Sequence, residues 1–240
     1  MIPLKDLTAP RKIPAGVCLI IALNLMAFLF ELTLNRRELQ GLVYLFGVIP
    51  ARFFSSDDVL AIPDQMTMLS MVTSMFLHGG WTHILGNMLY LWVFGKSVES
   101  RLGHGRFLLF YLLSGIGAAI VHVVFNIDSP TPTLGASGAV AGVLGAYIVT
   151  FPQGRILTLV PFIFLLTLEL PAVIVIGVWF ITQLFNGTAA IVDPRQMSGV
   201  AWWAHIGGFV VGILLMKVLQ PPRRSSWDYE GPYYSRHWDR

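Results

Sequence analysis

The chain has 240 residues, of which 55% are hydrophobic and only 12% charged, and its mean hydropathy is +0.68. Soluble domains usually carry about 25% charged residues, so this composition excludes an ordinary soluble domain and indicates a polytopic membrane protein. The single cysteine, Cys18, excludes an intramolecular disulfide and a cysteine-based metal site. The net charge of +3 is modest, and no nucleic-acid partner is expected.

Six apolar segments follow one another along the chain, each near the roughly 17–25 residues that cross the hydrocarbon core of a bilayer. They are Val17–Leu34, Trp81–Val98, Phe107–Phe125, Gly135–Phe151, Pro171–Phe185, which is short, and Val200–Leu219. The first follows basic residues, as a signal peptide does, but no small-x-small cleavage site comes after it. We therefore predict an all-α polytopic membrane protein in which all six segments cross the membrane.

The connections between these segments are uneven. In the first loop, Asn35–Gly80, the stretches Gly41–Pro50 and Met66–Leu77 are apolar but too short to span, which predicts a partly embedded outer loop. The segment Arg155–Glu169 is apolar and bracketed by prolines, so we expect it to lie against the inner face, where an extended conformation is one option.

Charge asymmetry predicts the orientation. With an inward N-terminus, the inside segments hold Lys5, Arg11, Lys12, Lys96, Arg101, Arg106, Arg155, Lys217, Arg223, Arg224, Arg236 and Arg240, and the outside segments hold Arg36, Arg37, Arg52 and Arg195. This positive-inside bias predicts that both termini are cytoplasmic. The expected organisation is a cytoplasmic N-terminal tail over residues 1–12, a six-helix domain over 13–219 and a cytoplasmic C-terminal tail over 220–240.

Four polar side chains from three non-adjacent segments are expected at one depth near the outer surface. His83 and Asn87 lie early in the inward-running second span. Ser137 opens the fourth span, and His205 lies near the outer end of the sixth. Packing residues scattered along helices would not be expected to share one depth in this way.

These residue types suit nucleophilic catalysis. Ser137 sits in the first turn of its helix, where the dipole favours negative charge, and neutral His205 can take the proton of its hydroxyl. His83 and Asn87, spaced i,i+4, can donate to a developing oxyanion beside the Ser137 N–H. Because the sixth span contains no Asp or Glu, the arrangement is predicted to be a dyad.

Small residues explain how the fourth and sixth segments come close enough. Small side chains at regular spacing let two backbones approach closely in lipid. They are Gly138, Gly142 and Gly145 on the fourth segment and Ala204, Gly208 and Gly212 on the sixth. This packing would carry His205 toward Ser137, and the short fourth helix would leave a water-filled recess above its N-terminus.

Taken singly, these residues have other interpretations. Ser137 alone is typical of helix packing, and Asn87 alone of an interhelical hydrogen bond. A metal site built from His78, His83 and His205 is disfavoured, because the chain has no HExxH motif and no carboxylate ligand nearby. A small transporter would instead place charges and broken helices at mid-membrane.

Other polar residues are interpreted as structural. Glu99 and Arg101, at the inner end of the second segment, are expected to form a capping or loop-bracing network. His104 lies in an inner loop, and His122 lies on a helix with no obvious partner.

Together these motifs resemble the rhomboid family of intramembrane serine proteases. The segment His78–Asn87 matches that family's H-x-x-x-N span with the histidine before it, and Gly135–Gly138 matches its nucleophile motif. Ala204–Gly212 matches its A-H-x-x-G-x-x-x-G helix, and Val98–Gly103 resembles the stretch that closes the second span. The resemblance covers roughly residues 13–219 with all motifs in order, and that ordered set is specific.

The resemblance implies a six-helix core with Ser137 as nucleophile, His205 as general base, and His83, Asn87 and the Ser137 amide as the oxyanion hole. It implies no metal, cofactor or ATP. Its substrates would be single-span membrane proteins, cut in or near their transmembrane segment by a protein embedded among lipids of a plasma or bacterial inner membrane. The loop Asn186–Gly199 and the fifth helix would correspond to the lid and lateral gate.

The alternative is a catalytically silent member of the same fold that binds membrane clients. Two departures from some relatives are visible. Ala141 stands where they carry an aromatic residue against which the histidine packs, and Ala51-Arg52-Phe53 stands where they carry a Trp-Arg pair.

Overall fold

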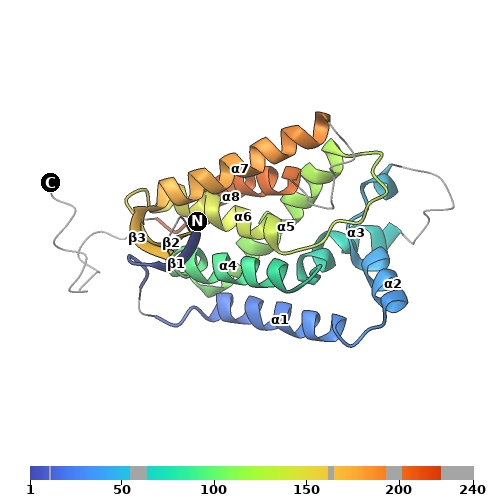
Figure 1. The fold of residues 1–240 in the computed structure, drawn as a ribbon, viewed down its shortest axis with the longest axis horizontal. Helices are drawn as coiled ribbons and strands as arrows, with labels where there is room; N and C mark the ends of the chain where they lie inside the picture. Colours follow the sequence, from blue (N-terminus) through green and yellow to red (C-terminus); the bar gives the residue numbers. More distant parts are fainter. Residues whose placement is uncertain (11, 55–63, 162–164, 193–201, 223–240) are drawn as a thin grey trace.

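The computed structural model describes residues 1–10, 12–54, 64–161, 165–192 and 202–222, and most of these are helical. The helices are α1 (Ala15–Glu31), α2 (Arg36–Phe46), α3 (Asp64–Thr73), α4 (Trp81–Leu102), α5 (His104–Phe125), α6 (Ser137–Thr150), α7 (Ala172–Val192) and α8 (Trp202–Leu219), and the strands are β1 (Ile2–Asp6), β2 (Arg155–Pro161) and β3 (Leu165–Pro171). The six longer helices run roughly along one axis, with the sheet at one end of the bundle and α2 and α3 at the other (Figure 1).

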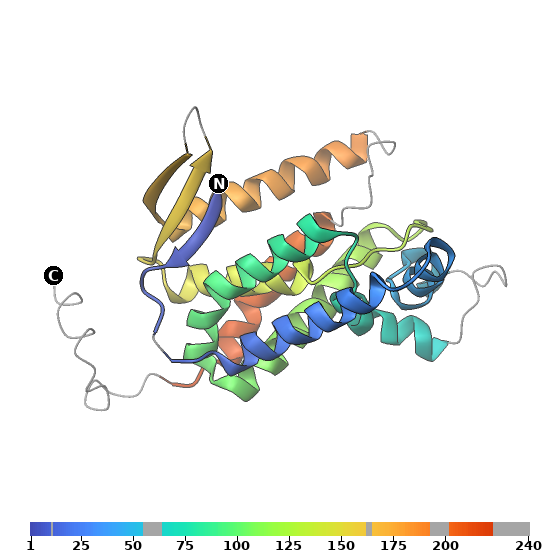
Figure 2. The same ribbon diagram turned by 60° about the horizontal axis from the view of Figure 1, so that its bottom comes forward.

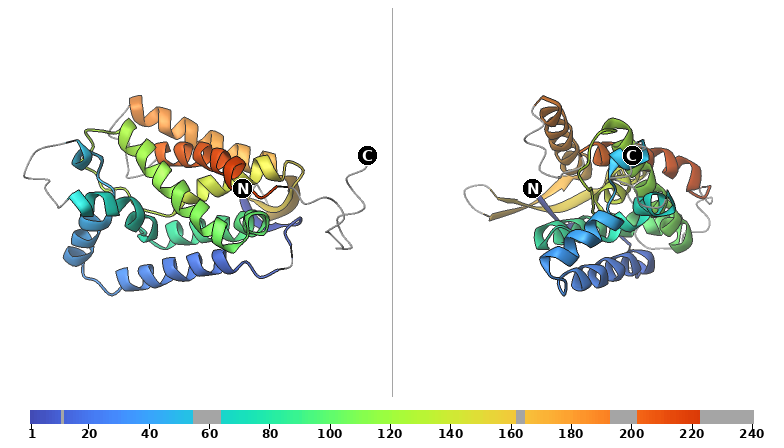
Figure 3. Two further views of the ribbon diagram at one scale, coloured as in Figure 1. Left: turned by 180° about the vertical axis from the view of Figure 1, so that it is seen from behind. Right: turned by 90° about the vertical axis from the view of Figure 1, so that its right-hand side faces the viewer.

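Helix α6 forms the centre of the bundle. Every residue from Gly138 to Tyr147 is buried, and α4, α5 and α8 pack around the helix (Figure 3). Such burial on all sides requires an apolar surface all round, and the Gly, Ala, Val and Leu residues of this segment supply it. The first residue of α6, Ser137, therefore lies at the end of the most enclosed helix.

The glycines of α6 and α8 allow these two backbones to touch. A Cβ atom added at Gly208 would lie 2.0 Å from the carbonyl oxygen of Gly138, and one at Gly212 would lie 2.1 Å from that of Gly142. A Cβ at Gly145 would lie 2.2 Å from the carbonyl oxygen of Phe209. The predicted close approach through small residues is confirmed, and it sets α6 and α8 at the distance that the site requires.

Each predicted apolar segment overlaps one of the helices α1, α4, α5, α6, α7 and α8. By length and composition, two of the described helices, α5 and α8, are long and apolar enough to cross a membrane, and the shorter apolar helical stretches are Ala15–Glu31, Ser137–Thr150 and Ala172–Gln183. The helix α7 runs beyond the predicted fifth segment, Pro171–Phe185, to Val192, so residues 186–192 of the expected lid loop are helical. Residues 193–199 of the expected lid loop and 223–240 of the expected tail lie outside the described residues.

The prediction of an all-α chain fails at one end of the bundle, where β1, β2 and β3 form an antiparallel sheet in that order. Ile2 of β1 is opposite Leu159, and Ile156 of β2 is opposite Leu170. The β2–β3 hairpin projects beside the start of α7 (Figure 2). A strand alternates its faces, so Ile156 can be buried while its neighbour Leu157 is only half-buried.

Residues 1–12, expected to be a tail, thus supply a strand, and hydrogen bonds fasten this strand to the bundle. The buried carboxylate of Asp6 accepts from Ser97 Oγ on α4 at 2.6 Å and from the backbone N–H of Thr8 at 2.8 Å. A buried carboxylate is tolerated only when such donors surround it. The N-terminal segment is therefore part of the folded domain.

Glu99 caps α1 from the neighbouring helix. Its two carboxylate oxygens accept from the backbone N–H groups of Gly16 at 2.7 Å and Val17 at 2.8 Å, and His104 Nδ1 also contacts it. The first N–H groups of a helix have no partner within the helix and favour negative charge. The predicted structural network at this end is confirmed, and Arg101 extends it by donating to the carbonyl oxygen of Pro221.

The apolar stretches of the first loop overlap the short helices α2 and α3. Asn35 and Glu38 form a capping box at the start of α2, which explains why the helix begins there. Arg52 donates to the carbonyl oxygen of Tyr44 at 2.5 Å, and its guanidinium lies 3.9 Å from the centre of the Tyr44 ring. Arg52 thus braces this loop against α2.

Candidate active site

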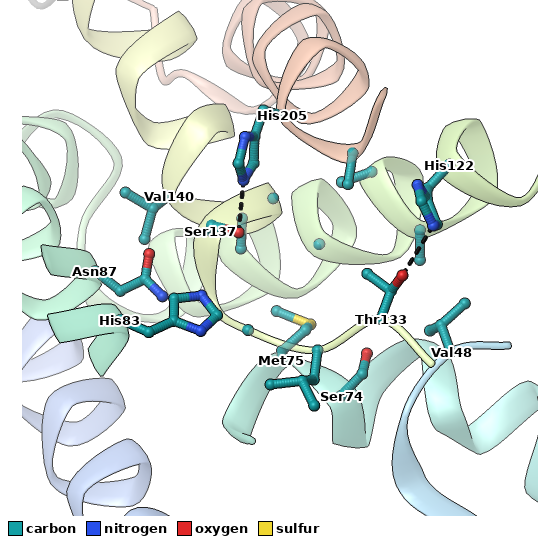
Figure 4. A pocket seen from close by; sticks show the side chains of 18 of the residues that line it. Val48, Ser74, Met75, His83, Asn87, His122, Thr133, Ser137, Val140 and His205 are labelled. Carbon is teal, nitrogen blue, oxygen red and sulfur yellow. Dashed lines mark hydrogen bonds between the residues drawn. The ribbon is translucent and has the colours of Figure 1, made fainter. Parts of the chain in front are cut away.

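Ser137 and His205 meet at the N-terminal end of α6. His205 Nε2 lies 2.8 Å from Ser137 Oγ (Figure 4). Ser137 is half-buried, whereas only 8% of His205 is exposed. A serine hydroxyl donates a hydrogen bond to an imidazole nitrogen that carries no proton, so this geometry suits a neutral histidine that takes the serine proton.

Gln183 contacts the other nitrogen of the His205 ring. Its side-chain oxygen lies 2.6 Å from His205 Nδ1, and both side chains are buried. The predicted dyad does not include this residue, because that prediction considers only carboxylates of the sixth segment as orienting groups. An amide in an otherwise apolar part of the fifth segment was the available signal.

Two tryptophans hold the sides of the His205 ring. The Trp179 ring is tilted against it with centroids 5.8 Å apart, and the Trp202 ring meets it edge to face at 5.9 Å. These contacts supply the aromatic support that Ala141 cannot supply. The histidine is therefore fixed by packing from α7 and from its own helix.

His83 approaches Ser137 from the opposite side to His205 (Figure 4). A Cβ atom added at Gly135 would lie 2.7 Å from His83 Nε2 and 3.7 Å from Ser137 Oγ. Gly135 also has a φ of +124°, which a residue with a side chain rarely adopts. A glycine two residues before the serine thus lets the His83 ring reach the backbone beside Ser137.

Asn87 lies one turn after His83, and a second histidine holds it. Asn87 Nδ2 donates to His78 Nε2 at 3.1 Å, while His78 Nδ1 faces the carbonyl oxygen of Phe76 at 3.4 Å. Burial, with the nearby His83, lowers the pKa of His78 to about 4, so its ring is neutral and can accept. The second N–H of the Asn87 amide can therefore donate to a group bound in the cavity.

The loop that carries His78 is anchored in turn to α1. The backbone N–H of His78 lies 3.2 Å from both carboxylate oxygens of the buried Glu31. The prediction did not include this supporting layer around Asn87, because no spacing in the sequence connects the end of the first segment to the loop before the second.

The four predicted side chains line one cavity of about 590 Å³, to which α4, α5, α6, α7 and α8 all contribute residues. It extends past Ser137 to His122, whose Nε2 lies 2.9 Å from Thr133 Oγ1. Towards α7 it is bounded by Tyr90 and Trp179. A cavity of this volume lies within the usual range of ligand-binding pockets.

Metal binding receives no support from the described parts of the chain, where no three His, Cys, Asp or Glu side chains come together as a metal site would require. The rings of His78 and His83 are 5.1 Å apart, but His78 is occupied by Phe76 and Asn87.

Comparison with known proteins identifies a family. The family model described as "Rhomboid domain" matches residues 65–222. Rhomboid protease GluP of Bacillus subtilis is 33% identical over 215 residues, which cover 89% of this chain and 36% of that protein. Rhomboid protein 1, mitochondrial, of Saccharomyces cerevisiae is 30% identical over 228 residues, covering 84% of this chain and 63% of that protein.

A plant relative is similar over a greater share of its own length. Rhomboid-like protein 11, chloroplastic, of Arabidopsis thaliana is 27% identical over 236 residues, which cover 94% of this chain and 73% of that protein. The chain thus spans only part of the relatives it matches, and the relatives' names include both bacterial and organellar proteins.

Proposed function

The chain belongs to the rhomboid family, and we propose that it is a serine endopeptidase that cleaves membrane proteins within the bilayer. The observation that carries the proposal is the 2.8 Å contact between Ser137 Oγ and His205 Nε2 inside a cavity that His83 and Asn87 also line. Nucleophile, base and oxyanion donors in one cavity are the groups that acyl transfer needs.

The reaction follows from these positions. His205 Nε2 takes the proton of Ser137 Oγ as that oxygen bonds to the carbonyl carbon of the substrate. The tetrahedral intermediate collapses with cleavage of the C–N bond, and His205 returns the proton to the leaving amine. Water then attacks the acyl-enzyme with the same base, which restores the serine and releases the carboxylate product.

The oxyanion of each intermediate would be held by the backbone N–H of Ser137, by Asn87 and by His83. The N-terminal end of α6 adds the positive end of its dipole at the same point. Such donors are effective in a site that excludes bulk water, because they are already aimed before the reaction begins.

We propose that α1, α4, α5, α6, α7 and α8 cross the membrane, that α2 and α3 lie partly embedded at its outer surface, and that the sheet lies at the inner surface. The distribution of Lys and Arg supports cytoplasmic termini and a site near the outer side of a plasma or bacterial inner membrane. Membrane lipids would surround the bundle, and no metal or cofactor takes part.

The substrates would be single-span membrane proteins that enter sideways beside α7. This helix packs against α8, α6 and the sheet, and it meets α4 through the rings of Tyr90 and Trp179, whose centroids are 6.4 Å apart. Lateral entry at that aromatic contact leads directly into the cavity.

The test is cleavage of a purified single-span reporter with a fluorophore and quencher flanking a transmembrane segment that contains Gly and Ala. We expect Ser137→Ala to abolish cleavage without changing the thermal unfolding midpoint. A fluorophosphonate probe should label the wild type at Ser137 and should label His205→Ala no faster than it labels Ser137→Ala.

A wild-type protein that neither cleaves the reporter nor takes the probe contradicts the proposal. If it still binds single-span helices, that result supports the alternative of a catalytically silent client-binding protein.

A further inference from the structure

We infer that Gln183 is a positioning residue that orients His205 and makes the orientation of the base depend on where α7 lies. This inference rests on the proposed function. It arises from one contact, the 2.6 Å separation of Gln183 Oε1 and His205 Nδ1, which joins the proposed base to a neighbouring helix.

The hydrogen bonds of Gln183 determine which end of its amide faces the histidine. Its Nε2 donates to the carbonyl oxygen of Trp179 and to Thr182 Oγ1, each at 3.3 Å. The oxygen of the amide is therefore the atom left for His205, and because it can only accept, His205 Nδ1 must carry the proton.

The tautomer that follows is the one catalysis requires. With the proton on Nδ1, the Nε2 atom of His205 is the acceptor that faces Ser137 Oγ at 2.8 Å. Loss of the acceptor on Nδ1 would allow the ring to turn or to take the other tautomer, in which Nε2 cannot receive the serine proton. Gln183 thus has the orienting role that a carboxylate has in a triad, without its charge.

The contact joins two helices that also touch through an aromatic pair. On α7, Gln183 lies one turn after Trp179 and close to Phe180, whose ring packs on Phe209 of α8 with centroids 4.6 Å apart. The opposite side of α7 is exposed, as at Val178, which is 42% exposed. The position of α7 relative to α8 therefore sets the distance between Gln183 and His205.

A consequence concerns the order of events. If α7 moves outward to admit a substrate, Gln183 leaves His205, and the base is fully oriented only after α7 returns. The protein would thereby couple closure around a substrate to activation of Ser137. The other titratable groups that interact electrostatically with His205 are His83 on α4 and His122 on α5. Within the described residues, neither contacts its Nδ1 atom.

The test compares Gln183→Leu, which keeps size but removes the acceptor, with Gln183→Glu, which keeps an acceptor and adds charge. For Gln183→Leu we expect kcat on the reporter and the rate of fluorophosphonate labelling to fall about 10-fold, as for one lost hydrogen bond, with little change in KM. For Gln183→Glu we expect activity to persist but to be lost on acidification at a higher pH, because a carboxylate stabilises the imidazolium. Val178→Ala is the control on the same helix and should leave the labelling rate unchanged.

A double-mutant cycle tests the dependence on α7. Phe180→Ala removes the ring that holds α7 on α8, so it should slow labelling in the wild-type background and add nothing to Gln183→Leu. Additive effects of the two substitutions would overturn this inference and leave the proposed function intact. The same holds if the wild type is active, kcat is unchanged in Gln183→Leu and the pH profile is unshifted in Gln183→Glu. If the wild type itself neither cleaves nor is labelled, the proposed function is overturned and this inference with it. If thermal unfolding shows that Gln183→Leu is not folded, the pH profile of Gln183→Glu alone tests the inference.

Discussion

Gly208 offers the most direct way to separate Ser137 from His205 without altering either. A Cβ at Gly208 would lie 2.0 Å from the carbonyl oxygen of Gly138, whereas ordinary contacts begin at 3.4 Å. In Gly208→Ala, α6 and α8 must therefore move apart by about 1.4 Å if the packed backbones cannot yield elsewhere. Applied in full to the 2.8 Å contact of Ser137 and His205, this shift gives about 4.2 Å, which is too long for a hydrogen bond.

The expected loss follows from that displacement. Misplacement of reacting groups by about 1 Å can cost about 100-fold in rate, so kcat/KM of Gly208→Ala on the reporter should fall at least that far. Overpacking of this kind should also lower the free energy of unfolding by about 1–3 kcal/mol, read as a lower thermal unfolding midpoint.

The matched control is Gly105→Ala on α5, where an added Cβ meets nothing within 4 Å. There the same substitution should leave cleavage unchanged and stabilise the helix by up to about 1 kcal/mol. Wild-type cleavage by Gly208→Ala would refute the argument that backbone contact between α6 and α8 sets the geometry of the site.

Two further substitutions probe the side of the cavity that holds Asn87 and the end of the bundle that holds Glu99. Asn87→Ala should lower kcat by about 10- to 1000-fold, the range for loss of one oxyanion donor. The thermal unfolding midpoint is measured on the same variant, and an unchanged kcat would show that Asn87 does not have that role. Glu99→Ala leaves the N–H groups of Gly16 and Val17 unpaired and should lower stability by about 2 kcal/mol in thermal unfolding. Glu169→Ala, which breaks the exposed pair with Arg155, should cost less than about 0.5 kcal/mol, and equal losses in the two variants would contradict the capping role.

The pairing of Ser137 with His205 could be predicted because it depends on regular features. Glycines at i,i+4 allow two helices to touch, and the direction of each span sets the depth of its polar groups. Both rules concern repeated local patterns, which can be recognised in a single sequence. The positions of the six longer helices follow from apolar runs for the same reason.

Gln183 and β1 could not be predicted by those rules, for different physical reasons. The contact of Gln183 with His205 depends on how α7 is rotated about its own axis, and an apolar helix with no strong polar face does not indicate that rotation. Strand β1 is short, and its pairing with β2 is decided by hydrogen bonds to a segment far along the chain. The hydrogen bond between Asn87 and His78 does not follow from helix periodicity, because a loop conformation brings the two side chains together.

The three-stranded sheet also bears on how the protein assembles. Ile2 pairs with Leu159, so β1 leaves the ribosome long before its partner strand exists. Contacts between such distant parts of a chain form late, since the intervening segment must first be ordered at a cost in entropy. We expect α1 and α4 to α6 to form before the sheet closes, and closure of the sheet would then fasten the start of α7 to these helices before α8 is added.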